Sequence, residues 1–201
     1  MSRIHPLVKK ASKGKLPEWA KVSKGRYAHM ERVAALLEEW ARAADLSKRE
    51  RQRWVALGYL HDALKGASPG VLRPGVRKDL RGLPDSVLHG PAASARLEEE
   101  GVEDQGLLLA VRYHTLGHPS LDDAGKALYV ADFLDPGRNL RNSWRAGLRS
   151  RMPGDLDEVT REVVGARVAH LIKKGRPVLP ETLAFWNSLV GGEPWAPVSE
   201  A

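Results

Sequence analysis

Apolar residues recur along the chain at the spacing of one helix face, and no segment keeps the strict apolar–polar alternation of a half-buried strand. The first clear stripe follows one side of a helix that begins near Arg26, with Tyr27, Met30, Val33, Leu37 and Ala41. Because similar stripes continue through most of the sequence, the pattern predicts an all-α fold.

A second helix is predicted after a capping box, in which the Ser47 hydroxyl accepts a hydrogen bond from a free helix N–H and Glu50 reaches back. Its apolar stripe consists of Trp54, Leu57, Gly58, His61 and Leu64. Gly66 is a suitable residue to end this helix. Three prolines within 69–84 then predict a long irregular connection.

Later helices are bounded by similar signals. Pro91 suits the first position of a helix, and Asp104 can cap the next one. Asp122 or Asp123 can cap a helix that Asp135-Pro136 ends. Further stripes occupy residues 138–151, 156–174 and 181–190. No repeat or linker separates these segments, which favours a single domain.

Composition narrows the class of protein. Of 201 residues, 42% are hydrophobic and 28% are charged, which is ordinary for a globular chain. Cysteine is absent, and this excludes a disulfide framework, a cysteine nucleophile and a zinc ribbon. The longest apolar run, from Leu107 to Val111, is far shorter than a membrane span, and no secretory signal is visible. The sequence therefore predicts a soluble cytoplasmic protein that does not engage a membrane.

The positive charge is unevenly distributed. The formal net charge is +7, and the excess lies in residues 1–26, whose only acidic residue is Glu18. A nucleic-acid-binding domain would carry its positive charge over the folded surface instead. We interpret residues 1–25 as a solvated basic leader, 26–190 as the domain and 191–201 as a C-terminal tail, with an arm that binds RNA or another polyanion as the alternative.

The candidate chemistry lies in histidines and aspartates. Successive helical segments each offer one ligand or one adjacent pair to a common interior: His29, His61 with Asp62, His89, His114 and Asp132. Imidazole nitrogens with carboxylate oxygens suit iron, manganese, cobalt, nickel or zinc. A single histidine on an apolar face is more often a hydrogen-bonded core residue than a ligand. The His61-Asp62 pair favours a cation, because a buried aspartate without a cation or donor is costly, although an Asp near a helix end can also be a cap.

The order His … His-Asp … His … His … Asp resembles that of the HD-domain phosphohydrolases. The residues that flank these positions resemble those of the YqeK branch of that family, whose members hydrolyse diadenosine tetraphosphate symmetrically to two ADP. The resemblance covers about residues 26–190 and is carried by Arg26-Tyr27-Ala28-His29, Leu60-His61-Asp62-Ala63-Leu64-Lys65, His114-Thr115-Leu116-Gly117, Tyr129-Val130-Ala131-Asp132 and Asp135-Pro136-Gly137-Arg138.

The resemblance implies a single HD-domain helical bundle with a dinuclear metal site in its interior. By position, one metal ion would be held by His29, His61, Asp62 and Asp132. The second would be held by His89 and His114, with Asp62 bridging the two. The family implies iron, with manganese, cobalt, nickel and zinc as alternatives.

The same resemblance suggests which residues would act on the substrate. Asp62 and Lys65 are the candidate catalytic residues, and Lys65 and Arg138 are placed to contact phosphates. The family tends to have Arg after His-Thr-x-Gly where this chain has His118, which is a third candidate for phosphate binding.

We therefore expect a metal-dependent hydrolase of nucleotide polyphosphates, with diadenosine tetraphosphate as the leading substrate. One alternative is the same centre acting on another phosphate ester, such as a nucleoside mono- or triphosphate or a guanosine alarmone. The other is a polyanion- or RNA-binding protein with an inactive metal site. The expected partner is the nucleotide substrate, nucleic acid is not expected, and a homodimer is left open.

Overall fold

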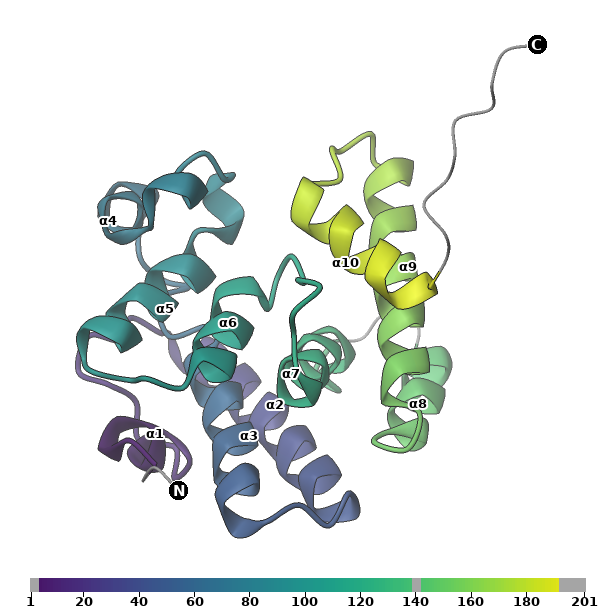
Figure 1. Cartoon of the computed structure of the whole chain (residues 1–201), viewed down its shortest axis with the longest axis horizontal. Helices are drawn as coiled ribbons and strands as arrows, with labels where there is room; N and C mark the ends of the chain where they lie inside the picture. The colour runs from purple at the N-terminus through teal and green to yellow at the C-terminus, as the bar shows by residue number, and fades with distance from the viewer. Residues whose placement is uncertain (1–3, 139–141, 192–201) are drawn as a thin grey trace.

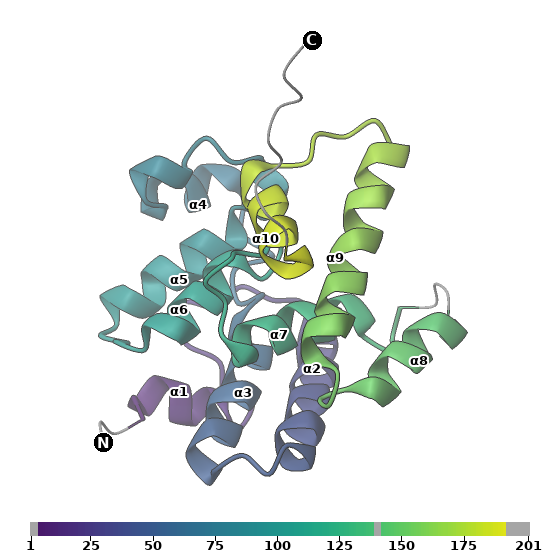
Figure 2. The same ribbon diagram turned by 45° about the vertical axis from the view of Figure 1, so that its right-hand side comes forward.

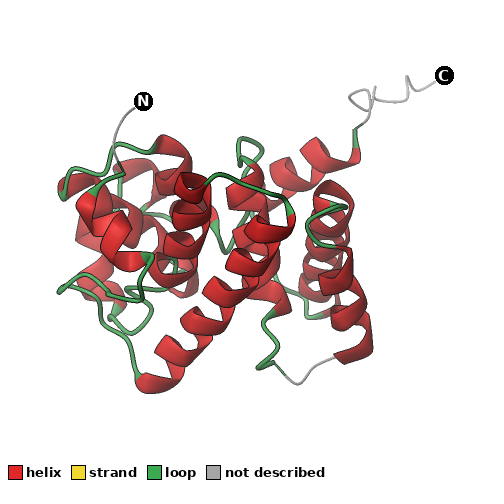
Figure 3. Cartoon of the chain, turned by 90° about the horizontal axis from the view of Figure 1, so that it is seen from below, coloured by secondary structure: helices red, strands yellow, loops and turns green. Residues whose placement is uncertain are grey.

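The computed structural model describes residues 4–138 and 142–191, and every regular element in this part of the chain is a helix (Figure 3). This confirms the predicted all-α class. The α-helices are α1 (Pro6–Ala11), α2 (Lys24–Ala43), α3 (Lys48–Leu60), α4 (Pro69–Gly75), α5 (His89–Glu99), α6 (Gln105–Tyr113), α7 (Asp123–Leu134), α8 (Asn142–Arg151), α9 (Leu156–Lys173) and α10 (Pro180–Val190). Two short 3-10 turns, η1 (Lys78–Leu80) and η2 (Asp85–Val87), lie between α4 and α5.

Three predicted N-caps are confirmed by hydrogen bonds. The Ser47 hydroxyl accepts from the Glu50 amide at 3.2 Å, Asp104 accepts from Leu107 at 2.9 Å, and Asp122 accepts from Gly125 at 2.9 Å. Each of these bonds satisfies one amide that the first turn of the helix leaves free. Side-chain chemistry at a single position therefore determines where α3, α6 and α7 begin.

The predicted end of the second helix at Gly66 is wrong. The helix α3 ends at Leu60, and residues 61–66 form turns. In this segment the Ala63 carbonyl accepts from the Lys21 amide at 2.8 Å, and the Gly66 amide donates to the Lys21 carbonyl at 3.1 Å. The backbone thus pairs with a distant segment in place of continuing the helix.

The predicted irregular connection over 69–84 is also only partly correct. It contains α4, which begins at Pro69, and the short turn η1. Proline is tolerated at the start of a helix because its missing N–H would have no partner there. Pro69 therefore begins a short helix in this segment, Pro74 lies within its last turn, and Pro84 precedes η2.

The core lies where α2, α3 and α7 meet. The helix α3 contacts α2, α6 and α7, whereas α9 packs on both α7 and α10 (Figures 1 and 2). Gly58 in α3 lies against Ala34 in α2, and an added Cβ would fall 2.5 Å from the Ala34 Cα. This close approach of α2 and α3 brings together the helix ends that carry His29 and His61.

The expectation that the leader is a solvated arm is wrong for its described residues. The helix α1 packs on α3, as Figure 1 shows, with Val8 and Ala11 buried and Leu7 and Trp19 packed against the core. Its lysines remain exposed. One face of this short segment is apolar, so it folds onto the domain while its charge stays in water.

No helix in residues 4–138 and 142–191 is long and apolar enough to cross a membrane. The predicted C-terminal tail falls outside the described residues apart from Gly191. The expectations about a homodimer and about nucleic acid stay predictions.

Candidate metal centre

The six predicted ligands lie at neighbouring ends of five helical segments. His29 is near the start of α2, Asp132 is in the last turn of α7, and His61-Asp62 directly follow α3. His89 begins α5 and His114 caps the end of α6. All six side chains are buried, with at most 8% of any residue exposed. Helix ends therefore concentrate six polar residues in the interior of an otherwise apolar core.

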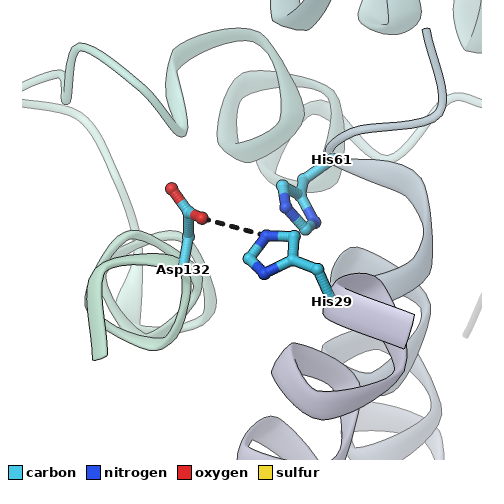
Figure 4. A group of neighbouring side chains, drawn as sticks. All are labelled: His29, His61 and Asp132. Carbon is cyan, nitrogen blue, oxygen red and sulfur yellow. Dashed lines mark ion pairs between the residues drawn. The ribbon is translucent and has the colours of Figure 1, made fainter. Parts of the chain in front are cut away.

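These residues form two clusters, and within each cluster the ligand atoms all lie within 4.8 Å of one another. The first cluster is His29, His61 and Asp132, whose side chains converge from three separate segments (Figure 4). The second cluster is Asp62, His89 and His114. Each cluster offers nitrogen and oxygen donors, and the structure thus contains two candidate metal sites.

Asp62 lies between the two clusters. Its Oδ1 is 3.1 Å from His89 Nε2 and 3.5 Å from His114 Nε2. Its Oδ2 is 3.5 Å from His61 Nε2 and 3.7 Å from His29 Nε2. One carboxylate oxygen therefore faces each cluster, which is the arrangement that a bridging ligand requires.

Three imidazoles are oriented by hydrogen bonds from Nδ1. Nδ1 of His61 donates to the Gly58 carbonyl at 2.9 Å, and Nδ1 of His114 donates to the Val111 carbonyl at 2.9 Å. Nδ1 of His29 donates to Asp135 Oδ2 at 2.7 Å. With the proton on Nδ1, the Nε2 lone pair of each ring is free to bind a metal ion.

Asp135 supports the first cluster, although the sequence predicted no site role for it. It is 1% exposed, and its carboxylate also accepts from Arg32 Nε at 2.6 Å and from the Gly137 amide at 3.0 Å. The available signal was its spacing, because residues three apart on a helix share a face and Asp132 was already a candidate ligand.

The donor set is suited to metal ions. Among the described residues, Nε2 of His29 and of His61 are buried without a hydrogen-bond partner, although His29 Nε2 lies 3.2 Å from Asp132 Oδ1. The Nε2 atoms of His89 and His114 face each other at 3.0 Å. Buried polar atoms are rarely left unpaired, and two facing imidazole nitrogens require a proton or a cation between them. The residues present therefore fit a pair of metal ions.

The pKa values of Asp62, His89 and Asp132 are also consistent with metal binding. Burial alone would raise the pKa of Asp62, but the charge of His61 and hydrogen bonds from His114, His61 and His89 hold that pKa far below its usual range. Burial lowers the pKa of His89 to about 4. Burial would also raise the pKa of Asp132, yet the neighbouring His29 and the charge of Arg138 lower it. At neutral pH Asp62, His89 and Asp132 are in the unprotonated forms that bind metal. Burial lowers the pKa of His29, but Asp132 and Asp135 raise it above its ordinary value.

Positive side chains surround the clusters. Lys65 Nζ lies 3.2 Å from the Ser86 carbonyl and 3.4 Å from His89 Nδ1. Arg138 donates to Asp132 Oδ1 at 2.7 Å, and Arg26 donates to Asp62 Oδ2 at 2.6 Å. Burial lowers the pKa of Lys65, and the charges of Arg26 and Arg138 lower it further. These three cations therefore act on one region of the site.

Arg26 was not among the predicted site residues. Its position three residues before His29, on the same face of α2, was the available signal.

His118 lies apart from this group. Within the described part of the chain its ring stacks on Tyr113, with centroids 4.6 Å apart, and its Nδ1 accepts from the Ser120 amide at 3.1 Å. These contacts leave its predicted role in phosphate binding unsupported.

Comparison with known proteins assigns the family. The sequence profile of the HD domain matches residues 26–137, which is more than half of the chain and contains all six candidate ligands. The chain belongs to the HD-domain family. This HD-domain protein is a hydrolase, the class to which its relatives belong.

Two relatives carry the same name. A protein of Staphylococcus aureus named symmetrical bis(5'-nucleosyl)-tetraphosphatase is 30% identical over 185 residues, covering 89% of this chain and 91% of the relative. A protein of that name from Halalkalibacterium halodurans is 28% identical over 171 residues, covering 82% and 89%. A solved structure from Clostridium acetobutylicum, described as a predicted HD superfamily hydrolase involved in NAD metabolism, matches with a TM-score of 0.74. It is 20% identical, covers 91% of this chain and 95% of that one, and thereby supports the fold.

Proposed function

We propose that this HD-domain hydrolase cleaves diadenosine tetraphosphate symmetrically into two ADP. The observation that carries the proposal is the position of Asp62, which presents one oxygen to each of two His/Asp clusters. This geometry occurs in a chain that spans most of the length of relatives named for the same reaction.

Each cluster has a separate role in the proposal. His29, His61 and Asp132 would hold one ion, His89 and His114 would hold the other, and Asp62 would join them. A metal pair supplies a water nucleophile at neutral pH and positive charge opposite the attacked phosphoryl group. Iron is the proposed metal, and manganese, cobalt, nickel and zinc share its preference for these donors.

The remaining work of the protein is to hold the polyphosphate. Phosphoryl transfer depends mainly on positioning and on stabilising negative charge. Lys65 and Arg138 lie beside the two clusters, and their positive charges can pair with phosphate oxygens. The bonds from Nδ1 keep the imidazoles fixed while the substrate binds.

Product analysis tests the proposal. The metal-reconstituted protein is incubated with diadenosine tetraphosphate, and the nucleotides are separated by chromatography. ADP as the sole product is the expected result. AMP with ATP would indicate asymmetric cleavage and contradict the proposal, whereas turnover of mononucleotides alone would point to another phosphate ester as the substrate.

A further inference from the structure

A cavity of about 460 Å³ lies beside the first cluster, between the N-terminus of α2 and the turn that follows α7. Its lining carries three arginines and one carboxylate, Asp135; the lining residues are Ser23, Gly25, Arg26, His29, Arg32, Asp135, Gly137 and Arg138. His29 belongs to the first cluster, and its buried Nε2 has no hydrogen-bond partner among the described residues. The cavity therefore opens directly onto the candidate metal centre.

Two of the arginines contact the very oxygens that face the first cluster. Arg26 Nη1 is 2.6 Å from Asp62 Oδ2, which also lies 3.5 Å from His61 Nε2. Arg138 Nη2 is 2.7 Å from Asp132 Oδ1, which also lies 3.2 Å from His29 Nε2. A cation bound to these oxygens would share them with a guanidinium, and the two like charges would repel each other.

Both side chains have room to move away. The Arg26 side chain is 33% exposed and that of Arg138 is 41% exposed, whereas the carboxylates they contact are nearly buried. Arg32 differs, because it holds Asp135 with two hydrogen bonds of 2.6 and 2.9 Å and so fixes His29. Arg32 is a positioning residue, and Arg26 and Arg138 are the guanidinium groups free to turn toward a ligand in the cavity.

The protein backbone adds to this positive site. Ser23 and Gly25 contribute to the lining, so the positive end of the α2 dipole lies at the cavity. The Ser23 hydroxyl accepts from the Arg26 amide at 3.2 Å and fixes the first turn. Just before it, Lys21 is held by its two backbone bonds to Ala63 and Gly66. Ser23 and Gly25 precede the residues matched by the HD-domain profile.

We propose that this cavity binds the phosphates of the nucleotide beyond the attacked phosphorus, and that Arg26 and Arg138 exchange a carboxylate partner for a phosphate when metal ions occupy the clusters. The inference rests on the proposed function. It assigns to Arg26 a role in binding the substrate, and it couples phosphate affinity to metal occupancy. Guanidinium groups suit this exchange because they pair equally well with carboxylate and phosphate oxygens.

The test is binding of ADP, the proposed product, measured by equilibrium dialysis together with the metal content of the same samples. Arg26→Ala should weaken ADP binding to the manganese-loaded protein by about tenfold while both metal ions are retained. In chelator-treated protein, where Arg26 stays on Asp62, the same substitution should change ADP affinity much less. Arg26→Lys should recover part of the affinity, because it keeps the charge without the planar fork.

Arg42→Ala is the matched control, since Arg42 lies on the same helix and pairs with Glu38 in an exposed contact far along α2. It should leave ADP affinity unchanged. Arg138→Ala, measured in the same way, decides the question if Arg26→Ala does not fold.

Unchanged ADP affinity in Arg26→Ala would overturn the inference. Equal losses with and without metal, accompanied by reduced metal content, would also overturn it and leave Arg26 as a structural partner of Asp62. Failure of the wild-type protein to hydrolyse the dinucleotide would contradict the proposed function alone, because ADP binding is read separately from turnover.

Discussion

Replacing Asp135 by asparagine should weaken metal binding at the first cluster. Oδ2 of Asp135 accepts from His29 Nδ1 at 2.7 Å and from Arg32 Nη2 at 2.9 Å, whereas Oδ1 accepts from Arg32 Nε and the Gly137 amide. In Asp135→Asn the amide oxygen can take the place of Oδ1. The NH₂ group then takes the place of Oδ2, where it meets two other donors, His29 Nδ1 and Arg32 Nη2. His29 escapes this clash by moving its proton to Nε2, which removes the lone pair that faces the cluster.

The size of the effect follows from these contacts. Loss of a supporting hydrogen bond behind a metal-binding histidine typically costs 10- to 100-fold in metal affinity, and we expect a loss in about that range. Two charge-assisted bonds are lost together, which should lower the free energy of unfolding by about 2 to 4 kcal/mol. Saturating metal should restore most of the activity, because the ligand itself remains.

The assay is a manganese titration of chelator-treated protein, followed by calorimetry. Asp155→Asn is the control, since Asp155 pairs with Arg151 at 2.9 Å on the surface. A stability loss in Asp135→Asn with unchanged metal affinity would refute the reasoning, because it would leave Asp135 with a purely structural role.

The same variant should alter the response to acid. Burial would raise the pKa of Asp135, but hydrogen bonds from His29 and Arg32 hold it well below its usual range. A carboxylate with a depressed folded pKa contributes fully above its unfolded pKa of about 3.9, and that contribution disappears as pH falls toward the folded value. The difference in unfolding free energy between wild type and Asp135→Asn should therefore shrink as pH falls below about 4. A difference that grows in acid would contradict this assignment.

Four further variants have defined outcomes. Asp62→Ala should abolish activity and lower the metal content of both sites, whereas His89→Ala should mainly empty the second, as measured by metal analysis; equal occupancy in both variants would argue against a shared Asp62. Lys65→Ala should retain metal but reduce kcat/KM by about thirtyfold, on the order of 2 kcal/mol, and a change confined to metal content would contradict a role at the phosphates. Deleting residues 1–20 should lower the melting temperature by on the order of 10 °C, because Val8 and Ala11 are buried; an unchanged melting curve would show that this packing adds no stability.

The parts of the fold that could be predicted are those determined by neighbouring residues. The caps at Ser47, Asp104 and Asp122 each depend on a side chain and an amide three residues on. The end of α3 could not be predicted in this way, because the turn after Leu60 is fixed by hydrogen bonds to Lys21, about 40 positions earlier in the chain.

The basic leader shows a second limit. Its charge density suggested a solvated arm, and the few apolar residues around Val8 and Ala11 are too short a stripe to indicate packing. Their burial depends on an apolar surface of α3 that exists only in the folded protein.

The residues of the site also differ in how far the sequence predicts them. The six candidate ligands could be placed by their order in the chain, and the structure brings them together. Arg26 and Asp135 lie three residues from His29 and Asp132, a spacing that placed them near the ligands. Their roles could not be assigned, because these depend on contacts with Asp62 and His29 from other helical segments. His118 was selected by its position next to a familiar motif, whereas its ring stacks on Tyr113.

The central claim, a pair of metal ions joined by Asp62, is tested most directly by anomalous diffraction from crystals of the metal-reconstituted protein. With data collected at the absorption edge of the added metal, two peaks should lie on either side of Asp62. One should fall among His29, His61 and Asp132, and the other between His89 and His114. A single peak, or none at full reconstitution, would contradict the account.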